Sequence, residues 1–173
     1  MKLYSFLIPT ILIHSISAAN ILIVGLLESV SHRIWYEQLI GGLVQAGHNI
    51  TLLSYADPKL KLDNYTVIKF PELAYTENLQ DEMTTTELGF LENLSELWWW
   101  LETTGEFDLQ SDSMQTILDY PRDKFDLIIF EMFNGQHLYH LVDYFGNPPV
   151  IGISPLGFSP NILYWNIPFG ILA

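Results

Sequence analysis

The stretch Asn20–His48 limits what this chain can fold into more than any other part of the sequence. It opens with the apolar run Ile21–Leu27, which suits a strand covered on both faces, as in a parallel sheet. A short loop carrying Ser31 and His32 follows. The pattern then predicts a helix that ends at Gly47, because apolar residues recur at helical spacing. The expected inward face comprises Ile34, Trp35, Leu39, Ile40, Leu43 and Val44.

The rest of the chain repeats this alternation of strands and helices. A further strand is expected at Asn49–Ser54. Strand, helix and strand then occupy about 35 residues, the size of one βαβ unit, which has a right-handed crossover. Further strands are expected at Tyr65–Pro71, Phe125–Phe130 and Val150–Ile153, and helices at Thr84–Thr103, Met114–Asp119 and Gly135–Phe145. The predicted fold class is α/β, with a doubly wound, mostly parallel, Rossmann-like sheet.

The first 19 residues have the layout of a secretory signal peptide. A lysine at position 2 precedes the apolar run Leu3–Ile13, and small residues follow up to Ala19. We therefore expect cleavage after Ala18 or Ala19, a domain at residues 20–173 and entry into the secretory pathway; an N-terminal anchor is the alternative. Glycosylation sequons agree with this, and of the three at Asn49, Asn64 and Asn93 we expect the last two to be used, because Asn49 begins a buried strand.

The charge and the lack of cysteine exclude several classes of function. The net charge of −13 argues against nucleic acid as a partner. Thirteen acids and one base lie between Glu72 and Asp123, which we interpret as a solvated, acidic helical face. With no cysteine there is neither a disulfide framework nor thiol chemistry. No metal site is expected, since His137 and His140 lack the usual metalloprotease spacing.

Aromatic and polar residues offer candidates for a small-molecule pocket. Three consecutive tryptophans, residues 98–100, cannot share one helical face, so at least one must point outward. They are interpreted either as core packing with one surface ring or as an apolar wall for a lipophilic ligand. A plain connecting loop is the alternative for Ser154. The candidate ligand-binding residues are Ser31, Trp98, Trp99, Phe133 and Ser154.

His32 and Glu131 are the candidate catalytic residues. In doubly wound sheets the first and fourth strands are neighbours, and ligands bind beyond their carboxyl ends. His32 follows the first of these strands and Glu131 the fourth, so we expect the two side chains to meet. A carboxylate next to one ring nitrogen fixes the tautomer and stabilises the imidazolium, which is the arrangement of a general base. Without such a partner His32 is equally well a half-exposed loop histidine.

Other catalytic motifs are missing. No Gly-x-Gly-x-x-Gly follows the first strand, which argues against a dinucleotide-binding domain. The segment Gly152–Gly157 is one residue away from a nucleophile elbow, but no histidine follows Ser154, so the hydrolase order cannot be met.

Several motifs in order resemble the N-terminal half of animal UDP-glycosyltransferases, the glucuronosyl- and glucosyltransferase family with the glycosyltransferase-B fold. They are the signal peptide running into the first strand, Ser31-His32, Gln45–Thr51, Phe125–Glu131 and Pro149–Ser154. The resemblance covers the whole mature chain. It implies that His32 is the general base that deprotonates an acceptor hydroxyl and that Glu131 is its acidic partner. The family more often has aspartate at that position, and we expect the longer glutamate to keep the pair with altered geometry.

The resemblance also implies the partners and the location. A small lipophilic, hydroxyl-bearing acceptor would receive glucose or glucuronate, with inversion, from a UDP-sugar that is a co-substrate; no cofactor is expected. The protein would reside in the endoplasmic reticulum lumen or at its membrane. Nothing in the sequence matches the family's His-Gly-Gly donor site or its C-terminal membrane anchor. We therefore expect a truncated product that is inactive alone. A non-catalytic lipophile-binding module or a non-functional product is the alternative, and a homo-oligomer stays open.

Overall fold

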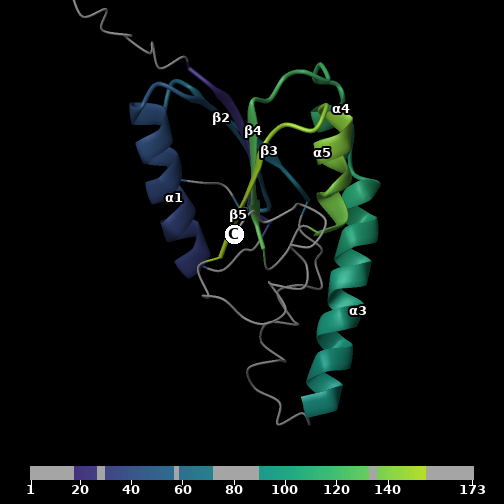
Figure 1. Ribbon diagram of the computed structural model, residues 1–173. Helices are drawn as coiled ribbons and strands as arrows, with labels where there is room; N and C mark the ends of the chain where they lie inside the picture. Colours follow the sequence, from purple (N-terminus) through teal and green to yellow (C-terminus); the bar gives the residue numbers. More distant parts are fainter. Residues whose placement is uncertain (1–17, 27–29, 57–58, 72–89, 133–135, 155–173) are drawn as a thin grey trace, which may run out of the picture.

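The protein has an α/β fold built on a five-stranded, all-parallel sheet (Figure 1). The computed structural model describes residues 18–26, 30–56, 59–71, 90–132 and 136–154. The signal peptide expected at residues 1–19 lies almost wholly outside the described residues. Among the described helices none is both long enough and apolar enough to cross a bilayer.

Strands and helices follow the order expected from the sequence. The strands are β1 (Asn20–Val24), β2 (Asn49–Ser54), β3 (Tyr65–Lys69), β4 (Leu127–Glu131) and β5 (Val150–Ile153). The helices are α1 (Val30–Gln45), α3 (Phe90–Leu109), α4 (Asp112–Leu118) and α5 (His140–Tyr144), with a single 3-10 turn η1 (Gln136–Leu138). The helix expected at Gly135–Phe145 is therefore divided into a 3-10 turn and a short α-helix.

The strand order β3-β2-β1-β4-β5 places the first and fourth strands side by side, as predicted. The two strands pair in parallel from Ile21 opposite Leu127 to Val24 opposite Phe130. Because the chain winds outward from β1 in one direction and from β4 in the other, the edge where these two strands end is the switch point of the fold. Side chains just beyond Val24 and Phe130 therefore lie at the position where this fold class binds its ligands.

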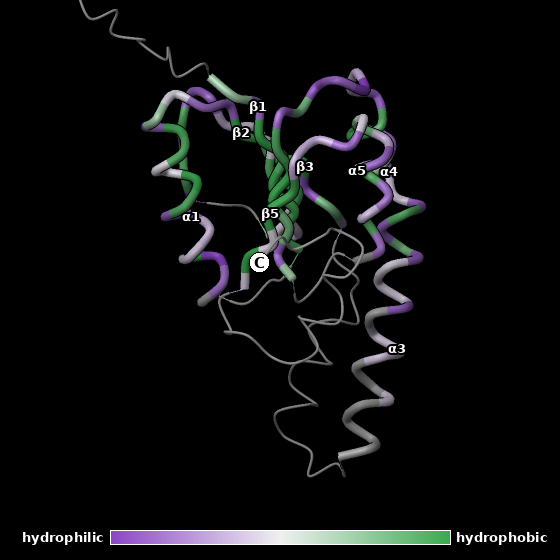
Figure 2. Tube along the Cα trace, in the orientation of Figure 1, coloured by the Kyte–Doolittle hydropathy of each residue, from purple (hydrophilic) through white to green (hydrophobic). Residues whose placement is uncertain are grey.

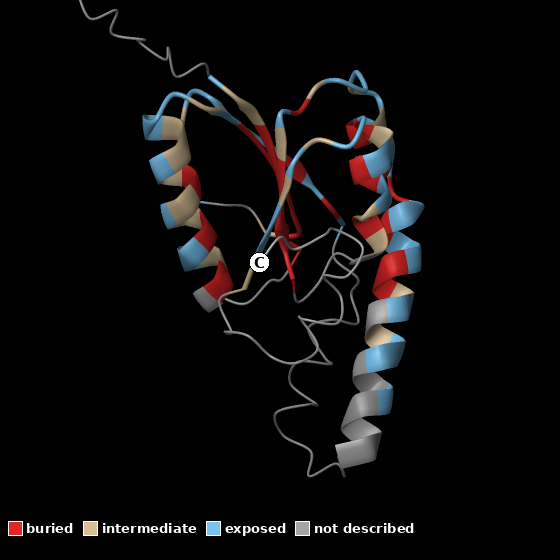
Figure 3. Ribbon diagram, in the orientation of Figure 1, coloured by how far each residue is buried: buried red, intermediate tan, exposed pale blue. Residues whose placement is uncertain are grey.

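Helices cover both faces of the sheet, with α1 on one face and α3, α4 and α5 on the other (Figure 1). On the α1 face, Tyr36 and Ile40 pack with Ile21, Ile23 and Ile129. On the opposite face, α4 and α5 pack against alternate residues of the same strands, among them Leu22, Val24, Leu53, Ile128 and Phe130. The strands are thus apolar at successive positions, which is the green centre of Figure 2, and their inner parts are buried in Figure 3.

The ends of α1 show which of the sequence expectations hold. Gly47 has a φ of +93°, and the amides of Gly47 and His48 donate to the carbonyls of Val44 and Leu43. This is a Schellman motif, so the predicted end of the helix at Gly47 is confirmed. The beginning differs, because the helix starts at Val30 and His32 lies in its first turn instead of in a loop.

The predicted inward face of α1 is wrong for its first turns. Ile34 and Trp35 are exposed, whereas His32, Tyr36 and Ile40, spaced four residues apart, face the sheet. The expectation followed hydrophobicity alone and ranked a histidine and a tyrosine below isoleucine and tryptophan. Burial of these two polar rings is acceptable only because they find a hydrogen-bond partner inside.

The acidic segment is solvated in part. Glu102 and Glu106 of α3 are exposed, as expected of an acidic surface, but Asp108 on the same helix is completely buried. The N-terminal half of α3 extends past the carboxyl ends of the strands (Figure 1). Most of the side chains between residues 72 and 101 lie outside the described residues.

Candidate active site

His32 and Glu131 lie in contact, although they are 99 positions apart in the chain. Nδ1 of His32 is 2.5 Å from Oε1 of Glu131, which is the last residue of β4. The register between β1 and β4 explains the meeting: Glu131 comes directly after Phe130, which pairs with Val24 at the end of β1, and α1 is the next helix after β1 in the chain. The spatial prediction made from the strand order is thus what the structure shows.

Tyr36 completes this contact on the other oxygen of the carboxylate. Its hydroxyl donates to Oε2 of Glu131. His32 and Tyr36 are one turn apart on α1, so a single carboxylate at the end of β4 bridges two successive turns of the helix. All three side chains are buried, and Glu131 has a hydrogen-bond partner on each oxygen.

Burial dominates the electrostatics of the Glu131 carboxyl. Its removal from water raises the pKa of Glu131 above the ordinary value, while the hydrogen bond from Tyr36 and the nearby His32 act in the opposite direction. The pKa of Tyr36 is also raised, by burial first and by the negative charge of Glu131 second. Tyr36 therefore stays a hydroxyl donor throughout the physiological range and does not compete as a base.

An ionised Glu131 dictates how the imidazole can act. A carboxylate only accepts hydrogen bonds, so the nitrogen facing it, Nδ1, must carry a proton. In the neutral ring the basic lone pair then belongs to Nε2, and the imidazolium formed when Nε2 takes up a proton is stabilised by the adjacent negative charge. The geometry is that of an oriented general base.

The histidine is more buried than the sequence suggested. His32 is 4% exposed and Glu131 is 1% exposed. Such burial suits the carboxylate, which only orients its neighbour. A base must also touch its substrate, so catalysis by His32 requires an acceptor hydroxyl to reach the ring at the carboxyl edge of the sheet.

The residues predicted to bind a ligand are only partly placed by the structure. Trp98 and Trp99 on α3 are 64% and 46% exposed, so two rings of the tryptophan triplet are at the surface, where the core-packing interpretation expected one. Ser154 follows β5 and is half-buried. The side chain of Ser31 and all of Phe133 lie outside the described residues.

The predicted glycosylation sites differ in accessibility. Asn64 is exposed in the turn before β3, as a glycan acceptor must be. The side chain of Asn93 in α3 is not among those described. Asn49 was expected to be buried at the start of its strand, but it is exposed, and its amide donates to the side chain of Asn20.

A hollow next to Tyr36 was not foreseen from the sequence. It runs between α1 and the end of β2, and Tyr36 forms part of its wall. The other lining residues are Arg33, Glu37, Ile40, Leu52, Ser54 and Ala56. Of the predicted ligand-binding residues whose side chains the structure describes, which are Trp98, Trp99 and Ser154, none lines it.

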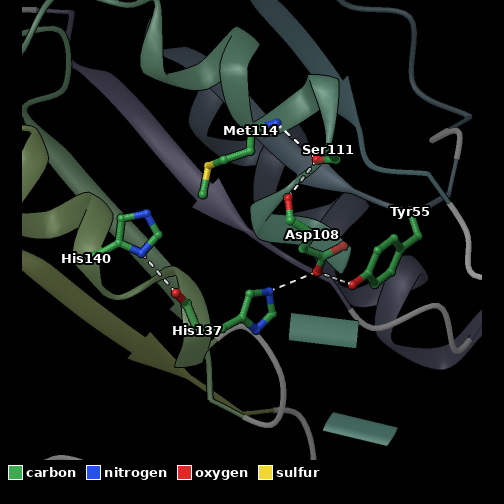
Figure 4. Close-up of polar contacts among 6 residues, drawn as sticks. All are labelled: Tyr55, Asp108, Ser111, Met114, His137 and His140. Atoms are coloured by element: carbon green, nitrogen blue, oxygen red, sulfur yellow. Dashed lines mark hydrogen bonds and ion pairs between the residues drawn. The ribbon is translucent and has the colours of Figure 1, made fainter. Parts of the chain in front are cut away.

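A second histidine and carboxylate meet on the opposite face of the sheet (Figure 4). Asp108, near the end of α3, accepts hydrogen bonds on Oδ2 from the Tyr55 hydroxyl and from Nε2 of His137, the latter at 2.9 Å. Asp108 is fully buried. This contact ties α3 to the residue after β2 and to the 3-10 turn after β4.

The two carboxylates differ in how they hold their histidine. Glu131 uses one oxygen for each donor, whereas Asp108 uses Oδ2 for both, and its buried Oδ1 has no hydrogen-bond partner among the described residues. The side chain of His137 packs closely on Gly105. A Cβ added at Gly105 would lie 3.3 Å from both Cβ and Cγ of His137 and 3.6 Å from its Nδ1. His137 therefore packs closely on α3 and also donates to Asp108 of that helix, which indicates a structural tie.

The comparisons with known proteins find no relative. No family model matches the sequence, and no match was found among the curated proteins or the solved structures. Within the part of the chain that the structure describes, no group of three or more histidine, aspartate and glutamate side chains could hold a metal ion.

Sequence reasoning missed Tyr36, Tyr55 and Asp108, and it considered His137 only as a metal ligand. For Tyr36 a signal existed, because a polar aromatic residue four positions after the candidate base lies on the same face of a helix. For the cluster around Asp108 there was none, since its members come from three separate segments whose approach depends on helix packing.

The raised pKa of Glu131 predicts how stability depends on pH. The folded state binds the Glu131 proton more tightly than the unfolded chain does, so the contribution of this group is complete below its ordinary pKa of 4.5 and is lost as the pH rises through the folded pKa. We expect the unfolding free energy of the wild type to fall relative to that of Glu131→Gln as the pH rises above 4.5, measured by urea denaturation. The exposed Glu106→Gln serves as the control. A difference that stays constant, or grows in favour of the wild type, contradicts this assignment.

The structural tie at Asp108 predicts unequal effects for two nearby histidines. Replacing His137 by alanine leaves a buried carboxylate with one donor fewer and should lower the unfolding free energy by about 3 kcal/mol. His140 is exposed, and its ring contacts the carbonyl of His137, so His140→Ala should cost less than about 0.5 kcal/mol. Equal losses in urea denaturation for the two variants would show that Asp108 does not depend on His137.

Proposed function

We propose that this chain is the acceptor-binding, base-carrying half of a UDP-glycosyltransferase. The observation that carries the proposal is the contact of His32 with Glu131 at the switch point of the sheet. This is where an α/β fold of this order places its ligands. The sequence resemblance to the animal family supplies the reaction class.

In this proposal the chain performs the proton transfer of an inverting displacement. Nε2 of His32 removes the proton of an acceptor hydroxyl as its oxygen attacks the anomeric carbon of the sugar, and the bond from that carbon to the UDP oxygen breaks. The imidazolium that results is stabilised by Glu131, whose carboxylate already faces Nδ1. A general base positioned in this way contributes about 10²- to 10⁴-fold to a rate.

Exposed aromatic rings support a lipophilic acceptor. Trp98 and Trp99 are exposed on α3, whose N-terminal half continues beyond the carboxyl ends of the strands. Rings of this size in water are a large apolar surface that a small lipophile could cover. The acceptor would thus approach from the same edge of the sheet at which His32 and Glu131 stand.

The UDP-sugar and the location belong to the proposal as well. The sugar nucleotide acts as a co-substrate, and the donor site of the family has no counterpart in the 173 residues. We therefore expect no sugar transfer by these residues without a donor half. The predicted signal peptide and the exposed Asn64 sequon support a place in the secretory pathway.

The burial of His32 favours a second candidate, a non-catalytic module that binds a small lipophile. In that case the contact with Glu131 is a buried ion pair whose role is to hold α1 against the sheet. The two candidates differ in one respect: only the first requires the His32 ring for chemistry.

The His32 ring decides between these candidates. In the chain joined to a UDP-sugar-binding donor half, we expect His32→Ala to lower the rate of transfer of radiolabelled sugar by at least about 10²-fold, while UDP binding is unchanged. The matched control is His140→Ala, which removes an exposed ring and should leave the rate within about twofold.

Urea denaturation of the same variants separates chemistry from folding. If His32→Ala remains folded and retains transfer, the base assignment is wrong and the binding module is the better account. Transfer by the isolated 173 residues would contradict the expectation that a donor half is needed.

A further inference from the structure

We propose that Tyr36 is a positioning residue of the His32–Glu131 pair and that it acts only because residue 131 is a glutamate. The inference rests on the proposed function and extends it to a residue outside the His32–Glu131 pair. It starts from one geometric fact: the two oxygens of Glu131 are divided between two side chains of one helix.

The division of the oxygens fixes the carboxylate. A carboxylate held on one oxygen can rotate about its last bond, which alters the direction in which it faces the imidazole. Oε1 is bound to His32 and Oε2 to Tyr36, so rotation breaks one contact or the other. A hydrogen bond to a charged group is stronger than one between neutral groups, so the two contacts together select one orientation of the carboxylate.

The position of Tyr36 is itself fixed by its surroundings. Its ring is buried in one cluster with Ile40 and residues of the sheet, and a Cβ at Gly25 would lie 3.1 Å from its Cε2 atom. Glycine at the end of β1 therefore lets the ring lie close to the strand. Packing therefore fixes the ring of Tyr36, and its hydroxyl donates from there to Glu131.

The length of Glu131 links the two contacts. An aspartate at this position would withdraw both oxygens towards β4 by about one C–C bond, ~1.5 Å. A hydrogen bond tolerates only a few tenths of an ångström around about 2.7–3.2 Å, so the shorter side chain cannot keep both donors. The tyrosine and the glutamate therefore form one unit, in which Tyr36 can hold the carboxylate against His32 only when residue 131 is a glutamate.

A double-mutant cycle on the 173-residue chain tests this unit without any sugar transfer. The measurement is the rate at which the Nδ1 proton of His32 exchanges with water, observed by NMR on ¹⁵N-histidine-labelled protein. We expect Tyr36→Phe to speed exchange by about tenfold or more, because loss of the Tyr36 hydrogen bond frees the carboxylate. In the Glu131→Asp background the same change should alter exchange by less than about twofold.

Two further variants keep the test decisive. Tyr144→Phe removes a hydroxyl that donates to the carbonyl of Leu118, and it should leave the exchange rate unchanged. Fluorotyrosine at position 36 preserves the ring and donates a stronger hydrogen bond, so exchange should slow even if Tyr36→Phe does not fold. Equal effects of Tyr36→Phe in both backgrounds, or unchanged exchange with fluorotyrosine, overturn the proposal.

The result of the proton-exchange experiment is independent of the result of the sugar-transfer assay. If His32→Ala retains sugar transfer, the base assignment fails, whereas the exchange cycle still decides whether Tyr36 holds Glu131. If Tyr36→Phe leaves the exchange rate unchanged while His32→Ala abolishes transfer, the assignment of the His32–Glu131 pair holds and Tyr36 is a packing residue.

Discussion

The buried carboxylate of Glu131 is the constraint on which the site depends. A charge removed from water is tolerated only when hydrogen-bond donors replace the solvent. Here both donors come from α1, through His32 and Tyr36, so the need to satisfy one carboxylate locks the beginning of that helix to the end of β4. The same contact that holds the helix in place aligns an imidazole at the switch point of the sheet.

Much of this arrangement could be predicted from the sequence. The apolar runs at β1, β2 and β4 predicted buried parallel strands, and the usual winding of such a sheet then made β1 and β4 neighbours. Because residues that follow adjacent parallel strands share one edge, the meeting of His32 with Glu131 followed without knowledge of any side-chain packing. Gly47 also predicted the end of α1, because helices often end at a residue with positive φ, which glycine adopts without strain.

What the sequence could not predict was decided by competition between side chains. Hydrophobicity predicted that Ile34 and Trp35 point inward. The hydrogen bonds to Glu131 instead favour burial of the helix face that carries His32 and Tyr36. The tie between Asp108 and His137 is hidden for a related reason, since an aspartate in an acidic helix has no local mark that distinguishes it from its solvated neighbours. Whether a polar side chain is buried depends on the hydrogen-bond partner that it can reach. That partner can be identified only once the fold is known.

The tautomer of His32 tests the central claim most directly. Nitrogen-15 chemical shifts of the two ring nitrogens, recorded at a pH where the imidazole is neutral, report which of them carries the proton. An ionised Glu131 that orients a base predicts the proton on Nδ1 and a lone pair on Nε2. A proton found on Nε2 would mean that Nδ1 accepts from a protonated Glu131, and the pair could not then take a proton from an acceptor.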